Sequence, residues 1–129
     1  MQFVNLTPHV ITIVSGNIEQ GARPGSFVAQ KSDLEVILEL PKGDKIATIE
    51  FDEESAKGTI PMRKKTLGEI SDLPPQQEGI VLIVSQVVAL AAAAAGRDTS
   101  DLAVPGQQVR DKADPRIVLG CLSLDIITA

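Results

Sequence analysis

The most strongly patterned stretch of this chain is Gly-Ile-Val-Leu-Ile-Val-Ser-Gln-Val-Val-Ala-Leu-Ala-Ala-Ala-Ala-Ala-Gly, at residues 79–96. The unbroken apolar run at residues 80–84 predicts a strand that is buried on both faces of a sheet. Ser85 is a suitable N-cap for a helix over residues 86–95, and Gly96 is a suitable residue to end that helix. We therefore expect a buried strand that leads directly into an alanine-rich helix.

Downstream of this stretch, short polar segments separate the helix from a second apolar run. Val-Pro-Gly at residues 104–106 and Asp-Lys-Ala-Asp-Pro at residues 111–115 predict turns, because proline and glycine favour turn conformations. Ile-Val-Leu-Gly-Cys-Leu at residues 117–122 predicts a strand, and residues 124–128 predict another. The segment thus ends in two closing strands.

Upstream of residue 79, β-branched and alternating apolar residues predict a series of short strands. Their expected ranges are 3–6, 10–14, 26–30, 34–40, 46–51, 59–62 and 65–70. The acidic stretch at residues 52–58 predicts a solvated loop, and Arg-Lys-Lys at residues 63–65 predicts a basic turn. The complete pattern predicts one domain over residues 1–129 of the α+β class, a mainly antiparallel β-sheet with one substantial helix at about residues 85–96.

Composition excludes several classes of function. The chain has one cysteine, so it cannot form an internal disulfide, and a cytoplasmic location is the natural expectation. No apolar run approaches the length of a membrane span, and the N-terminus lacks the features of a secretory signal. The formal net charge of −5 argues against general nucleic-acid binding, and only three phenylalanines represent the aromatic residues.

The candidate ligand-binding residues are arginines that lie next to predicted turns. Arg97, Arg110 and Arg116 carry guanidinium forks that can bind phosphate or stack on a flat base. Asp111 directly follows Arg110, as Asp98 follows Arg97, and such carboxylates can orient a guanidinium or accept from a ribose hydroxyl. Ordinary ion pairing at the surface is the alternative interpretation of the same residues.

The remaining polar candidates have simpler alternatives. Ser85 and the first N–H groups of its helix form a possible anion site, but Ser85 is equally explained as a helix cap. His9 is the only histidine, so we expect structural hydrogen bonding and no metal site. Cys121 lies in an apolar run and is expected to be a small buried hydrophobe. We assign no catalytic residue and no cofactor.

Two groups of short motifs resemble those of a known protein group. Asn-Leu-Thr-Pro-His at residues 5–9 resembles the opening of a group of small phage and prophage proteins. Such proteins continue with Val-Ser, Val-Pro-Gly, Val-Arg-Asp and Gly-Cys motifs, which occur here at residues 84–85, 104–106, 109–111 and 120–121. The match covers both ends of the chain and leaves out the middle.

This group is similar to the Thoeris anti-defence sponges, phage proteins that sequester cyclic ADP-ribose signals and, in some members, cyclic oligonucleotides. The resemblance implies a homo-oligomer that performs no catalysis and holds its ligand between subunits with arginines on the phosphates. Arg110 matches that role best through the Val-Arg-Asp motif, and Arg116 matches it more loosely. The chain departs from the family pattern because no aromatic residue is near these arginines in the sequence.

The leading hypothesis is therefore a non-enzymatic phage immune-evasion protein that binds a small anionic nucleotide signal. An alternative from another class is a protein-binding inhibitor or structural module, which would present a flat apolar patch in place of an arginine-lined cleft. A third is a metal-free nucleotide hydrolase, which requires Asp98 or Asp111 to lie beside His9.

Overall fold

A computed structural model of the chain describes residues 1–56 and 62–127. Strands predominate, and the described residues form one α-helix. In chain order the elements are β1 (Gln2–Asn5), β2 (Ile11–Gly16), β3 (Glu19–Gln20), β4 (Phe27–Ala29), a 3₁₀ turn (Lys31–Asp33), β5 (Leu34–Leu40), β6 (Thr48–Ala56), β7 (Met62–Ser71), β8 (Ile80–Ile83), α1 (Gln86–Ala94), β9 (Leu102–Asp111) and β10 (Val118–Ile126).

The main sheet has the order β1-β8-β9-β10-β2-β5, and the short β3–β4 pair joins it through β4 and β9. Its longest ladders, β9–β10 and β2–β5, are antiparallel, whereas β1–β8, β8–β9, β4–β9 and β10–β2 are short parallel pairings. A separate antiparallel pair is formed by β6 and β7. The predicted class, a mainly antiparallel α+β protein with one substantial helix, is confirmed.

The strand and helix at residues 80–96 follow their local signals. Leu82, Ile83 and Val84 are buried, as the unbroken apolar run predicts. Ser85 caps α1 by accepting a hydrogen bond from the N–H of Val88, and Gly96 ends the helix with a φ of 84°, which glycine adopts without strain. The predicted helix over residues 86–95 therefore begins at the correct residue and extends one residue past the end of α1 at Ala94.

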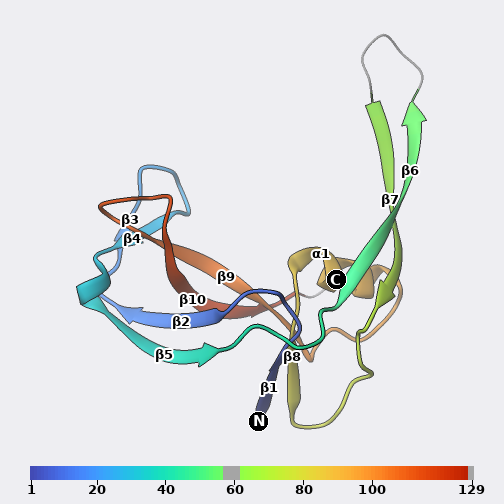
Figure 1. The fold of residues 1–129 in the computed structure, drawn as a ribbon, viewed down its shortest axis with the longest axis horizontal. Coiled ribbons are helices and arrows are strands. Elements are labelled where there is room, and N and C mark those ends of the chain that lie inside the picture. The colour runs from blue at the N-terminus through green and yellow to red at the C-terminus, as the bar shows by residue number, and fades with distance from the viewer. Residues whose placement is uncertain (57–61, 128–129) are drawn as a thin grey trace.

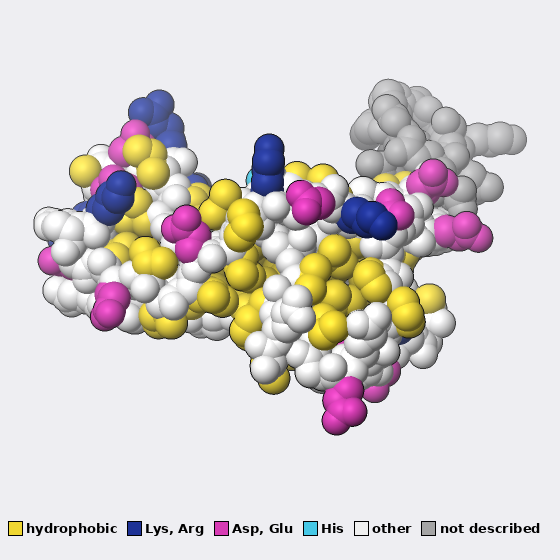
Figure 2. Space-filling model, turned by 60° about the horizontal axis from the view of Figure 1, so that its bottom comes forward, with side chains coloured by type: hydrophobic (Ala, Val, Ile, Leu, Met, Phe, Trp, Pro, Cys, Tyr) yellow, Lys and Arg dark blue, Asp and Glu magenta, His cyan; other side chains and the backbone are white. Residues whose placement is uncertain are grey.

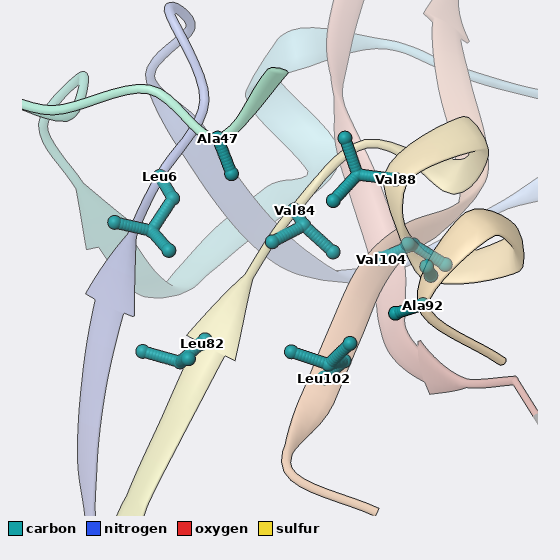
Figure 3. Packing of buried hydrophobic residues seen from close by; sticks show 9 residues of the cluster. Leu6, Ala47, Leu82, Val84, Val88, Ala92, Leu102 and Val104 are labelled. Atoms are coloured by element: carbon teal, nitrogen blue, oxygen red, sulfur yellow. The ribbon is translucent and has the colours of Figure 1, made fainter. Parts of the chain in front are cut away.

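Helix α1 covers one face of the main sheet. Its Val88 and Ala92 pack against Val84, Leu102 and Val104, an arrangement that Figure 3 shows with the helix lying over β8 and β9. The small alanine side chains let the helix approach the sheet closely. This face holds the larger buried cluster of the protein.

The opposite face of the sheet is not covered by a helix. Successive strand residues point to opposite faces, so Ile83 joins a different cluster from Leu82 and Val84, together with Ile13 and Ala103. An open groove of about 670 Å³ lies over this second cluster. Its lining residues are Met1, Phe3, Ile13, Ile37, Leu38, Val81, Ser100, Ala103, Leu124 and Ile126.

The β6–β7 hairpin forms an arm that extends away from the main sheet (Figure 1). The predicted acidic loop at residues 52–58 is wrong for residues 52–56, which continue β6, and the predicted basic turn at residues 63–65 lies inside β7. The register places acidic positions 53 and 54 opposite basic positions 65 and 64, a complementarity that strand-by-strand analysis overlooks. Residues 57–61 of the predicted loop and strand lie outside the described residues.

The predicted turn at residues 104–106 is also wrong, because Val104, Pro105 and Gly106 lie inside β9. The carbonyl of Ala103 accepts from the N–H of Val84, the residue that follows β8, so residue 105, two positions further, points toward the same edge. The pairing with β8 stops at Ala103 and the pairing with β4 starts at Val109. Proline is tolerated there because no strand requires its missing N–H.

The two predicted closing strands are a single strand, β10, which ends at Ile126; residue 128 of the second prediction lies outside the described residues. Within residues 1–56 and 62–127, no helix is long and apolar enough to span a membrane.

Candidate functional site

The Asn-Leu-Thr-Pro-His motif forms a compact hydrogen-bonded turn between β1 and β2. The buried side chain of Asn5 donates to the carbonyls of His9 (2.8 Å) and Pro41 (2.9 Å). Its Oδ1 accepts from both the N–H (3.0 Å) and the Oγ1 (2.7 Å) of Thr7. Because the amide is fully used inside the fold, the motif fixes the backbone at His9 and leaves the exposed imidazole at the surface.

A cavity of about 400 Å³ lies next to this turn, between the start of β2 and the β9–β10 pair. It brings together residues from separate motifs: His9, Pro105, Gln108 and Cys121 all line it. Its full lining also includes Val10, Ile11, Thr12, Val118, Leu119 and Gly120. The cavity thus combines apolar walls with a few polar groups, which is typical of small-molecule sites.

The Gly-Cys motif at one wall of this cavity is explained by close strand packing. A Cβ on Gly120 would lie 2.9 Å from the carbonyl oxygen of Thr12 and from a methyl group of Val14. The Sγ of Cys121 donates to the same Thr12 carbonyl at 3.4 Å. Burial, followed by the negative charge of Asp125, raises the pKa of the Cys121 thiol, so the residue behaves as the small hydrophobe that its surroundings predict.

Arg110 does not itself line this cavity, but it contacts a residue that does. It is two residues from Gln108 on β9, and its Nη2 donates to the Oε1 of Gln108 at 3.4 Å. Its Nη1 donates to the carbonyl of Pro115 at 3.0 Å, and Val118 faces it across the β9–β10 ladder. These contacts use part of the guanidinium and hold it beside two residues, Gln108 and Val118, that line the cavity.

Asp111 is the last residue of β9, and Arg116 lies in the turn that follows. Arg116 is 90% exposed and forms a bidentate pair with Asp114, at 3.0 and 3.1 Å. Asp111 accepts from the N–H of Ala113 at 2.9 Å, and so closes the turn. Neither Arg116 nor Asp111 lines the cavity.

Arg97 belongs to a different region and serves the fold. Its guanidinium forms a bidentate pair with Asp101, which is only 5% exposed, at 2.7 and 3.0 Å. It also donates to the carbonyls of Pro74 (3.0 Å) and Asp98 (2.8 Å). Arg97 therefore ties the loop before β8 to the loop before β9, and its guanidinium is directed to protein groups.

Ser85 lines a second cavity, of about 430 Å³, between the base of the arm and the first turn of α1. The residues that separate it from the first cavity are His9, Ile11 and Pro105, which line both. Phe51 also lines it, and no phenylalanine belongs to the lining of the first cavity. The sequence patterns did not indicate Phe51 or Gln108 as site residues, although Gln108 shares a strand with Arg110 at a spacing of two.

The carboxylates of the hydrolase hypothesis do not lie with His9. Asp98 accepts from the N–H of Ser100 at 2.9 Å, and this hydrogen bond is the main cause that lowers the pKa of Asp98. Neither Asp98 nor Asp111 lines a cavity that contains His9. Within the described part of the chain, no group of three or more His, Cys, Asp or Glu side chains is arranged to hold a metal ion.

On the face shown in Figure 2, the Lys and Arg side chains lie apart from one another and do not form one basic patch. Hydrophobic side chains gather across the middle of this face. The arrangement of the predicted arginines agrees with this view, because Arg97 lies in the network with Asp101 and Pro74 whereas Arg110 and Arg116 lie at the β9–β10 turn.

Comparisons with protein-family models, curated proteins and solved structures find no match to this chain. The resemblance to the Thoeris anti-defence sponges therefore stays a prediction from short motifs.

Proposed function

We propose that this chain is a non-enzymatic, cytoplasmic binding protein of phage origin that sequesters a small anionic nucleotide, a cyclic nucleotide or cyclic ADP-ribose immune signal. The observation that carries the proposal is the cavity between β2 and the β9–β10 pair. Residues from motifs far apart in the sequence meet there, and the guanidinium of Arg110 contacts Gln108 in its lining.

The chemistry of this cavity suits an anionic ligand of modest size. The guanidinium of Arg110 supplies positive charge and N–H donors, while Gln108 and His9 add groups that can both donate and accept. Hydrogen bonds from Asn5 hold the backbone at His9, so a ligand that contacts His9 has only its side chain to order. No carboxylate lines this cavity, and an anion therefore meets no repulsive charge from its walls.

The test is calorimetric titration of the purified protein with cyclic ADP-ribose and with cyclic di- and trinucleotides, followed by mass analysis of the recovered ligand. We expect Arg110→Ala to weaken binding about ten-fold or more, because hydrogen bonds to charged groups are worth about 1.5–3 kcal/mol. Arg23→Ala is the matched control, since it removes the same charge from an exposed residue outside the cavity.

Recovery of intact nucleotide supports sequestration, whereas recovery of a cleaved nucleotide makes the protein an enzyme. Equal binding by wild type and Arg110→Ala would remove Arg110 from the site. Absence of binding to every compound would contradict the proposed function and favour the alternative.

That alternative is an interaction module, and the open apolar groove opposite α1 favours it. Ile37 on β5 is 64% exposed, and no charged side chain belongs to the lining of the groove. We take the occupant to be a second copy of this chain: each copy carries a charge of −5, and an uncharged contact adds no close pairs of like charges to their repulsion. Ile37→Asp should then shift an oligomer to monomer in sedimentation, and an unchanged mass would exclude this face as the contact.

A further inference from the structure

We propose that the outer edge of β6, the edge that does not pair with β7, binds an extended basic segment of another protein, which inserts one large apolar side chain into the second cavity. This inference goes beyond the proposed function, because it concerns a different cavity and a different class of partner. Three observations carry it: the second cavity is apolar, it follows the outer edge of β6, and β6 is an acidic strand.

The second cavity follows the edge of β6 and the segment before it. Ile46, Ala47, Thr48 and Ile49 all line it, whereas no described residue of β7 does. Successive strand residues point to opposite faces, so a cavity over one face of a strand is lined by alternate residues. The consecutive residues in this lining therefore place the cavity along the edge of the strand.

The outer edge of β6 is open to a further strand. In the described part of the chain, β6 forms a ladder with β7 alone, and Figure 1 shows this pair standing clear of the main sheet. Just before β6, the N–H of Ala47 donates to the carbonyl of Leu6 at 3.1 Å, which fixes the base of the strand on the body of the protein. An extended peptide can add a strand to an edge of this kind.

The cavity beside this edge suits an apolar side chain. Its volume is about 430 Å³, and Ile49, Val87 and Val88 are among its apolar walls. Ile46 and Phe51 in the same lining are 36% and 42% exposed, so a partner that covers them removes apolar surface from water. Among the described residues, no Lys, Arg, Asp or Glu lines the cavity. Strand addition with one side chain in a neighbouring pocket is a recurrent mode of peptide recognition.

The composition of β6 indicates the charge of the partner. Its nine residues include acidic residues at positions 50, 52, 53 and 54 and no basic residue. Opposite charges on neighbouring strands stabilise the pairing, and like charges destabilise it. On the inner edge, β7 already follows this rule, with basic positions 64 and 65 opposite acidic positions 54 and 53. We therefore expect Lys or Arg in a segment that pairs with the outer edge.

A second copy of this chain does not fit the outer edge of β6. Two β6 strands that pair antiparallel over their full length set position 50 opposite position 54 and position 52 opposite itself. All of these positions are acidic, so the pairing would bring like charges together. The acidic strand thus disfavours self-pairing at this edge and favours a basic strand from another protein.

The experiment uses synthetic peptides with blocked ends. The reference peptide is Lys-Thr-Lys-Thr-Leu-Thr-Lys-Thr-Lys; the second has Ala in place of Leu, and the third has Glu in place of every Lys. Fluorescence polarisation of labelled peptides with the full chain measures their affinities. We expect the reference peptide to bind about ten-fold more tightly than either of the others, because Ala buries less apolar surface and Glu meets an acidic strand.

Variants of the protein test the cavity and the charge separately. Ile46→Asn should weaken the reference peptide about ten-fold, because it places a polar group in the apolar lining. Val36→Asn is the matched control, since Val36 is exposed and does not line the cavity. Glu50→Lys should weaken the reference peptide and strengthen the Glu peptide, whereas the same charge change at the exposed Glu35 of β5 should alter neither.

Hydrogen exchange separates strand pairing from simple filling of the cavity. With the reference peptide in excess, exchange of the amides of β6 should slow several-fold, because N–H groups at its outer edge gain hydrogen-bond partners. Exchange in β5, which lies away from the second cavity, should not change. Binding without slower exchange in β6 would contradict the pairing.

This inference and the proposed function can fail separately. Arg110→Ala should leave the affinity for the reference peptide unchanged, and Ile46→Asn should leave nucleotide binding unchanged, since Ile46 does not line the first cavity. The inference is wrong if the reference peptide binds no better than the Ala or Glu peptide, or if Ile46→Asn and Val36→Asn weaken it equally. It is also overturned if the reference peptide does not bind at millimolar concentration, a result that leaves the nucleotide proposal standing.

Discussion

Arg97 and Arg110 both lie beside loops in the sequence, but the fold uses them differently. The guanidinium of Arg97 is 21% exposed and binds both oxygens of the buried Asp101 together with the carbonyls of Pro74 and Asp98. Among the described residues, the guanidinium of Arg110 donates to the carbonyl of Pro115 and to Gln108, which lines an open cavity. A neighbouring turn therefore does not by itself make an arginine available to a ligand, because this depends on the partners that the fold supplies.

The largest effect should come from removing Arg97. Arg97→Ala leaves the buried carboxylate of Asp101 without its partner, and breaking such a pair costs about 3–5 kcal/mol in the free energy of unfolding. Chemical denaturation measures this loss. Arg97→Ala combined with Asp101→Ala should recover part of the stability, because the stranded charge is gone; a single variant as stable as wild type would contradict the structural role of Arg97.

A smaller effect, on binding instead of stability, should come from Arg110→Lys. This variant keeps the positive charge. A lysine ammonium lacks the planar fork of N–H groups with which Arg110 can bind a ligand while it also donates to Pro115 and Gln108. Its affinity for the tightest nucleotide in the calorimetric screen should lie between those of wild type and Arg110→Ala, with an unchanged free energy of unfolding. Affinity equal to that of wild type would show that only the charge matters.

The smallest effect should come from Arg116→Ala. Arg116 holds the pKa of the Asp114 carboxyl below its ordinary value. The pair therefore stabilises the fold at any pH above the ordinary pKa of an aspartate, and this stabilisation is lost as the pH falls through the lowered pKa. The variant should raise the pKa of Asp114 in an NMR titration. Because the pair is exposed, the midpoint of thermal unfolding at neutral pH should not change measurably.

The candidate site was only partly predictable. Arg110 contacts a residue that lines the first cavity and Ser85 lines the second, whereas the sequence predictions treated them as one ligand-binding set. Phe51 was predicted on a strand and given no role, although it brings an aromatic ring to the cavity that contains Ser85. Such convergence depends on contacts between residues far apart in the chain, and local patterns carry no information about them.

Local signals are sufficient to predict the strand and helix at residues 80–96, because unbroken apolarity, a serine N-cap and a glycine terminus act over a few neighbouring residues. The position of Pro105 inside a strand depends instead on strand pairing, because neither β8 nor β4 pairs with β9 at that residue. Strand pairing likewise made acidic and basic stretches into the two strands of the arm. The physical reason is that strand pairing satisfies backbone groups across long separations in sequence, so the partner, and not the local composition, determines the conformation.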